Sequence, residues 1–267
     1  MGISFSFYFR SMQKLSIVIV CKNEAGIIGE TLKSFSNLTD DIIVYDNGSN
    51  DGTQEVVKRY MAHLHEGKWQ GFGPTKNKAS QFAKYDWILS LDADEAIDEE
   101  LKTNLLQLDL ADDKTVYELK FKNFFENKWL RFGEWGNDRH IRLFNRCVVQ
   151  WNDARVHEEL VLPAACKMVA LYGYILHRTV KSITEYENKM RNYALMNAEK
   201  YFREGKRSSV TKAWLAAAFS FIKNYFFKLG FLDGKEGFLC ARIMADYTFL
   251  KYKNLGDLDK IRVNRQQ

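Results

Sequence analysis

The sequence predicts an α/β fold with a mostly parallel sheet, followed by a helical C-terminal region. Three continuous apolar runs, "LSIVIV", "DIIVYD" and "DWILSL", are rich in β-branched residues, as expected of strands buried on both faces. Segments with apolar residues at helical spacing follow these runs. Strands and helices that alternate in this way favour an open, mostly parallel sheet with helices on both faces.

The first strand is expected over residues 15–21. In the helix expected next, Ile28, Leu32 and Phe35 recur at helical spacing, and Asn23 is a candidate cap for it.

The remaining elements continue this alternation. The sequence pattern predicts a short helix over residues 75–85, the third strand over residues 86–91 and another helix over residues 98–108. After about residue 115 the segments are aromatic-rich and partly alternating, which predicts extended structure, antiparallel at the sheet edge. From Ser182 onward the sequence predicts helix to the end.

These patterns divide the chain into three regions: an N-terminal extension over residues 1–13, an α/β domain over residues 14–180 and a helical region over residues 181–267. The start, "MGISFS", fits the short pattern for N-myristoylation. Its apolar run lacks the basic leader and the cleavage site of a signal peptide. A frayed extension ahead of a start at Met12 is the simpler interpretation.

The composition limits the possible functions. The chain has 267 residues, of which 46% are hydrophobic, so it can bury a substantial core. Its net charge of +5 comes without a basic block, which argues against nucleic-acid binding and is compatible with anionic substrates or lipid headgroups. Four scattered cysteines indicate reduced thiols in an intracellular protein.

Polar residues follow each predicted strand, as "KNE", "DNGSNDG" and "DADE". Ligands of open α/β sheets bind at the carboxyl ends of the strands. In an extended segment Asp92 and Asp94 would point the same way and could hold one Mn²⁺ or Mg²⁺ that binds a diphosphate. Asp46, at the tip of the second strand, could accept a hydrogen bond from a nucleotide base. Acids that cap the following helix are the simpler alternative for "DAD".

"LSIVIVCKNE", "IIVYDNGSNDGT" and "WILSLDADE", in this order and spacing, resemble the N-terminal half of family 2 glycosyltransferases, which have the GT-A fold. This resemblance implies that residues 14–180 form a GT-A domain that binds a nucleotide sugar. It also implies that Asn23 and Glu24 line the nucleotide pocket, that Asp46 contacts the base, that Asp92 lies near the ribose and diphosphate, and that Asp94 binds the metal.

Later segments, among them "FGPTKNKA", "RHIRLFNR" and "VQWNDARVHEEL", resemble a subgroup near the lipopolysaccharide core β-glucosyltransferases. This resemblance implies transfer of a single sugar, glucose from a UDP-sugar, to a lipid-linked oligosaccharide such as lipopolysaccharide core. The protein would be cytoplasmic and peripheral at the inner face of the bacterial inner membrane. The Q-x-x-R-W motif of the processive members is absent, and no apolar run approaches the roughly 20 residues of a spanning helix.

An inverting transfer needs a carboxylate near the anomeric carbon of the donor, opposite the leaving diphosphate. We expect Glu158 in "VHEEL" to be this base, with Glu159 and Asp153 as alternatives. A turn with two exposed acids explains the same residues almost as well.

Further candidates carry positive charge or an imidazole. By resemblance His177 is a metal ligand beside Asp94, although a histidine in such a position is usually structural. Lys76, Arg139 and Arg142 are candidate phosphate contacts, and ordinary surface charge is the alternative for each.

The helical region contains an uncharged stretch, Ala213–Ile222, between Lys212 and Lys223. Aromatic residues mixed with lysines favour a helix that lies on anionic lipid. A buried core helix is nearly as well supported. We favour membrane contact because a lipid-linked acceptor must be reached at the membrane surface.

Two other functions fit the α/β pattern. A sugar-nucleotide pyrophosphorylase would carry a glycine-rich, basic loop after the first strand, and "CKNEAGIIGE" has none. A catalytically inactive nucleotide-sugar-binding membrane protein would not need the intact "DAD". The sequence leaves the donor sugar, the linkage and the oligomeric state open.

Overall fold

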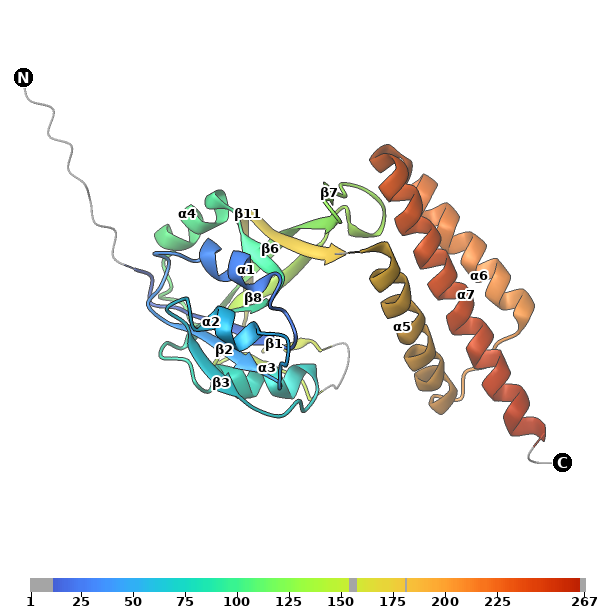
Figure 1. Cartoon of the computed structure of the whole chain (residues 1–267), viewed down its shortest axis with the longest axis horizontal. Helices are drawn as coiled ribbons and strands as arrows, with labels where there is room; N and C mark the ends of the chain where they lie inside the picture. The colour runs from blue at the N-terminus through green and yellow to red at the C-terminus, as the bar shows by residue number, and fades with distance from the viewer. Residues whose placement is uncertain (1–11, 154–157, 181, 265–267) are drawn as a thin grey trace, which may run out of the picture. The chain divides into compact units, whose positions relative to one another are not determined.

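The structure, a computed structural model, describes residues 12–153, 158–180 and 182–264 (Figure 1). The expected extension over residues 1–11, with its myristoylation pattern, lies outside the described residues. The chain divides into two compact units. They are Met1–Phe121 with Arg139–His177, and Lys122–Asp138 with Arg178–Gln267. The second unit thus includes a segment, residues 122–138, that the sequence pattern assigns to the α/β domain.

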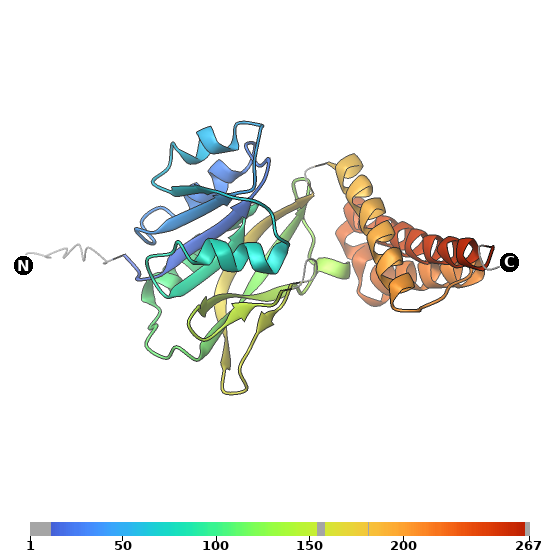
Figure 2. The same cartoon turned by 90° about the horizontal axis from the view of Figure 1, so that it is seen from below.

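The sheet has the strand order β3-β2-β1-β4-β8-β6-β11-β5, with β7 paired to β6 (Figures 1 and 2). The parallel strands are β1 (Ser16–Cys21), β2 (Ile42–Asp46), β3 (His63–Glu66) and β4 (Trp87–Asp92). The antiparallel pairs involve β5 (Glu95–Ile97), β6 (Thr115–Phe125), β7 (Lys128–Trp129), β8 (Arg139–Asn145) and β11 (Lys167–Val180). A separate pair consists of β9 (Gln150–Trp151) and β10 (Leu160–Val161). The α/β class is confirmed, and so is antiparallel pairing after residue 115.

Helices of the first unit pack on both faces of the parallel strands. They are α1 (Ile28–Ser34), α2 (Thr53–Val57), α3 (Phe72–Ser80) and α4 (Glu99–Gln107). Ile17 and Ile19 of β1 share a core with α1 and α4, while Val18 packs with Ala79 of α3 on the other face. This two-sided burial explains why the strands are continuous apolar runs.

Two sequence expectations are wrong in detail. The helix expected over residues 75–85 starts and ends earlier, as α3. Asn23 does not cap α1: the N-cap residue is Ile27, and no side chain forms a capping hydrogen bond there. Asn23 instead has a positive φ of 58°, and its Oδ1 accepts a hydrogen bond from Asn50 N–H at 2.9 Å. Asn tolerates this left-handed conformation better than most residues.

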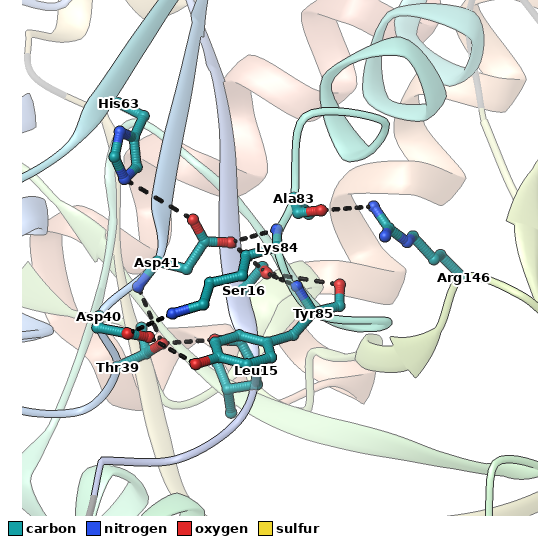
Figure 3. Close-up of polar contacts among 10 residues, drawn as sticks. All are labelled: Leu15, Ser16, Thr39, Asp40, Asp41, His63, Ala83, Lys84, Tyr85 and Arg146. Atoms are coloured by element: carbon teal, nitrogen blue, oxygen red, sulfur yellow. Dashed lines mark hydrogen bonds and ion pairs between the residues drawn. The ribbon is translucent and has the colours of Figure 1, made fainter.

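At the amino-terminal ends of β1 and β2, a buried carboxylate joins three segments (Figure 3). Asp41 is 3% exposed and accepts hydrogen bonds from Ser16 Oγ and from Lys84 N–H, the latter at 2.7 Å. The Ser16 hydroxyl in turn accepts from Tyr85 N–H at 3.0 Å. Asp41 therefore fixes the turn that leads into β4.

The Asp41→Ala variant should lose about 1–3 kcal/mol in the free energy of unfolding, because Ser16 Oγ and Lys84 N–H lose a buried acceptor. Urea denaturation followed by circular dichroism measures this. The matched control is Asp40→Ala, which removes an exposed ion pair with Lys84 and an exposed hydrogen bond from Tyr85, and should cost clearly less than Asp41→Ala. Equal losses in both variants would contradict the role given to Asp41.

The second unit is mainly helical, as expected from Ser182 onward. It contains η1 (Gly133–Trp135), α5 (Ile183–Arg203), α6 (Val210–Ile222), the π-helical η2 (Lys223–Phe227), η3 (Gly230–Asp233) and α7 (Gly234–Asn264). Ser182 and Ser209 cap α5 and α6 by accepting hydrogen bonds from Glu185 and Lys212 N–H. Across the described residues, every helix is too short or too polar to cross a bilayer.

Candidate active site

The segment "DADE" turns sharply after β4. Asp92 ends β4, Ala93 and Asp94 form a turn, and Glu95 begins β5. The expectation that Asp92 and Asp94 lie in one extended segment is therefore wrong, and the turn, not strand alternation, sets where their side chains point. Neither of them caps the next helix, because Asp98 accepts the capping hydrogen bond from Leu101 N–H of α4 at 2.9 Å.

Five charged residues meet beside this turn and form what we call the charged cluster: Lys76, Asp92, Glu95, Arg142 and Glu158. The Lys76 ammonium lies 3.2 Å from Asp92 Oδ1 and 3.0 Å from Glu158 Oε1. The Arg142 guanidinium lies 2.5 Å from Glu95 Oε1 and 3.5 Å from Asp92 Oδ2. The cluster thus joins α3, the ends of β4 and β5, β8 and Glu158.

The charged cluster keeps Asp92 ionised. Burial acts to raise the pKa of the Asp92 carboxyl, but Lys76 and Arg142 outweigh it and hold this pKa well below its usual range. Burial raises the pKa of Glu95, against the opposing effect of Arg142. The Asp92 side chain is 41% exposed, whereas Lys76 is only 4% exposed. Asp92 is therefore the member of the cluster most open to a ligand.

Asp94 pairs with His177. The two atoms Asp94 Oδ2 and His177 Nε2 are 3.5 Å apart, and both side chains are 23% exposed. The register of β11 on β5 sets His177 opposite Glu95. Burial acts to lower the pKa of His177, but Asp94 and Glu95 outweigh it, so this pKa is raised.

This pair fits a divalent cation only in part. Two ligand atoms on one cation at about 2.1 Å are roughly 3–3.5 Å apart when they occupy neighbouring positions. In the part of the chain that the structure describes, no group of three or more His, Cys, Asp or Glu side chains could hold a metal. Mg²⁺ commonly takes one or two carboxylates and completes its shell with phosphate oxygens and water. The donor set therefore suits a cation that arrives with a diphosphate.

Asp46 is fully buried at the end of β2, and its carboxylate is engaged by its own loop. Ser49 Oγ donates to Oδ1, while Ser49 N–H and Gln54 Nε2 donate to Oδ2 at 3.0 and 2.7 Å. Burial acts to raise the pKa of Asp46, but the hydrogen bonds from Ser49 and Gln54 lower it. In this arrangement Asp46 orders the loop at residues 47–53.

The same loop is bound to the residues after β1. Ser49 Oγ accepts from Asn23 N–H at 2.8 Å, and Thr53 Oγ1 accepts from Glu24 N–H at 2.8 Å. The polar ends of the first two strands, which the sequence predicted to be functional, thus form one hydrogen-bonded network.

A cavity of about 410 Å³ lies beside the charged cluster. Its lining includes Arg139, Arg142, Glu158 and Glu159, but not Asp153. Arg139 NH1 is also 3.7 Å from Glu118 of β6. The structure therefore brings two of the three candidate bases to a hollow that can hold a substrate.

Sequence reasoning missed Glu95. Its carboxylate is fully buried and accepts from Asp92 N–H at 3.0 Å as well as from Arg142. The signal that could have identified it is its position in the short segment "EAI", because a carboxylate buried in a strand must have a hydrogen-bond or ion-pair partner.

The comparisons with known proteins assign the class. The chain is a glycosyltransferase: the family model described as "Glycosyl transferase family 2" matches residues 16–154, just over half of the chain. The chain therefore belongs to glycosyltransferase family 2.

Relatives match most of the chain. The uncharacterized glycosyltransferase RP128 of Rickettsia prowazekii is 27% identical over 92% of this chain and 88% of its own length. The lipopolysaccharide core biosynthesis glycosyltransferase LpsC of Rhizobium meliloti is 28% identical over 88% of this chain and 89% of its own. Among solved structures, S. aureus TarS 1-349 aligns with a TM-score of 0.45 at 15% identity, over 96% of this chain and 92% of that one.

Proposed function

We propose that the protein is a metal-dependent, inverting glycosyltransferase that moves a single glucose from UDP-glucose to a lipid-linked oligosaccharide such as lipopolysaccharide core. The observation that carries this proposal is the pairing of Asp94 with His177 next to the charged cluster, at the carboxyl end of β4. The name of the relative LpsC supports the acceptor class. We also propose a location at the inner face of the bacterial inner membrane, where a lipid-linked acceptor would be reached.

Asp94 and His177 would hold Mn²⁺ or Mg²⁺, which when bound neutralises charge on the leaving diphosphate. Lys76 and Arg142 both pair with Asp92, so they are the proposed contacts of diphosphate oxygens. Arg142 also lines the cavity beside the charged cluster, which places its guanidinium next to the space that a donor would fill. Arg139 at the cavity is the proposed contact of an acceptor phosphate.

The donor nucleotide would lie over the ends of β1 and β2. Asn23 and Glu24 are the proposed lining of its pocket, Asp92 would face the ribose, and Asp46 would contact the base. The Asp46 carboxylate already accepts hydrogen bonds from Ser49 and Gln54. The nucleotide base would therefore have to displace one of these donors, or else contact the loop that Asp46 orders.

Glu158 is the proposed catalytic base. Its carboxylate would take the proton of the acceptor hydroxyl as that oxygen bonds to the anomeric carbon and the diphosphate departs from the opposite face. Its side chain is 19% exposed and lines the cavity. Glu159 lines the same cavity and remains the alternative, whereas Asp153 has less support.

Donor hydrolysis tests this function. Purified protein is incubated with UDP-, GDP-, ADP- and CMP-sugars in Mn²⁺, Mg²⁺ or EDTA, and nucleotide release is measured. We expect slow release of UDP from UDP-glucose that EDTA abolishes.

The same panel can contradict the proposal. Formation of pyrophosphate from UTP and a sugar phosphate would favour a pyrophosphorylase. Donor binding without turnover, even with a lipid-linked acceptor, would favour a catalytically inactive binding protein.

A further inference from the structure

In the second unit, α6 (orange in Figure 1) and the following η2 carry large apolar side chains that are exposed. We call the following six residues the apolar face, each at least 43% exposed: Trp214, Leu215, Phe219, Ile222, Phe226 and Phe227. Phe227 is the most exposed of them, at 74%. Large exposed apolar side chains that are concentrated in one segment mark a candidate interaction site.

The packing of α6 is the reverse of that of an ordinary surface helix. A surface helix normally buries its large apolar residues and exposes polar ones. In α6 the buried residues are Ala213 and Ala217, whereas Leu215, Phe219 and Ile222 point outward. Spacings of four and three residues keep these three side chains on one side of the helix. The helix packs on α7. Two of its aromatic rings take part, Trp214 against Phe249 and Phe221 against Phe238. Leu215, Phe219 and Ile222 remain exposed and are open to another partner.

Along the chain, the charged residues that flank the apolar face are basic, although Lys206 pairs with Glu204 and Lys228 pairs with Glu134. Between Glu204 and Asp233 the chain has no acidic residue, but it has five basic ones: Lys206, Arg207, Lys212, Lys223 and Lys228. Asp233 is itself buried, and its Oδ2 accepts hydrogen bonds from Arg131 and Phe132 N–H. Lys223, within the face, is exposed. Basic residues of this kind attract anionic lipid headgroups.

We propose that the apolar face is a membrane-docking surface, which lies in the boundary between headgroups and acyl chains of an anionic bilayer, with Lys212 and Lys223 at the level of the lipid phosphates. Aromatic and aliphatic side chains beside lysines are typical of helices that lie in this interface. This inference rests on the proposed function in one respect: a lipid-linked acceptor gives the protein a reason to bind a membrane. The residues of the apolar face belong to the second unit and are not part of the proposed active site.

Vesicle cosedimentation of the full chain tests this inference. We expect binding to vesicles of phosphatidylglycerol and phosphatidylcholine, and much weaker binding to phosphatidylcholine alone. The double variant Phe219→Ser with Phe227→Ser should bind at least about tenfold more weakly, because it loses two aromatic rings that would enter the bilayer. Lys223→Glu should weaken binding to the anionic vesicles alone.

The matched control is Met61→Ser, which removes a side chain that is 96% exposed in the first unit and should leave vesicle binding unchanged. Circular dichroism checks that each variant is folded. UDP release from the donor should be equal in all variants. If the wild-type protein released no UDP, that result would count against the proposed function and not against the docking surface.

Two results would overturn the inference. The first is vesicle binding by the double variant as strong as that of the wild-type protein. The second is a wild-type protein that does not bind anionic vesicles and is a dimer by light scattering, while the double variant is a monomer. That outcome would assign the apolar face to a second copy of the chain.

Discussion

The Asp94→Asn variant should transfer sugar about 10²–10³-fold more slowly than the wild-type protein at saturating donor, because it loses the charged ligand of the metal that stabilises the leaving diphosphate. His177→Ala should act in the same direction, and raising the Mn²⁺ concentration should restore part of its activity. Radiolabelled sugar transfer at several Mn²⁺ concentrations measures both effects.

The control for Asp94→Asn is Asp86→Asn, which lies just before β4 and pairs with Arg146 on the surface. It should leave the rate unchanged. A normal rate and a normal Mn²⁺ requirement in Asp94→Asn would remove Asp94 from the metal site.

The Glu158→Gln variant should lower kcat by about 10²–10⁴-fold, since glutamine cannot accept the proton of the acceptor hydroxyl. It also weakens the contact with Lys76, so the affinity for UDP must be measured alongside. We expect that affinity to change little compared with kcat. Initial rates over a range of acceptor concentrations separate the two effects.

Glu159→Gln is the matched control, because Glu159 lines the same cavity and has no ion pair with Lys76 among the described contacts. It should retain most of the activity. If Glu159→Gln loses activity and Glu158→Gln keeps it, the two roles are exchanged.

The core of the fold could be predicted from the sequence because its parallel strands are buried on both faces. β1, β2 and β4 are continuous apolar runs for that reason. β3 reads "HLHE" and is half exposed, so it carries no such signal. α2 has only five residues, too few for a helical period to show.

The place of the site could be predicted, but not its contacts. Polar residues after β1 and β2 are hydrogen-bonded to one another, as their common position at the strand ends suggested. The partners of Asp92 come from α3 and β8, 16 and 50 residues away in the chain, and only the folded topology brings Lys76 and Arg142 to it. The extended geometry assumed for "DAD" was wrong because β5 begins immediately after the turn.

Calorimetric titration of the protein with UDP, in Mn²⁺ and in EDTA, tests the central claim most directly. If Asp94 and His177 hold a cation that binds the diphosphate, Mn²⁺ should tighten UDP binding at least about tenfold in the wild-type protein, and this gain should disappear in Asp94→Asn. UDP affinity that is the same in Mn²⁺ and in EDTA, or no UDP binding at all, would contradict the claim.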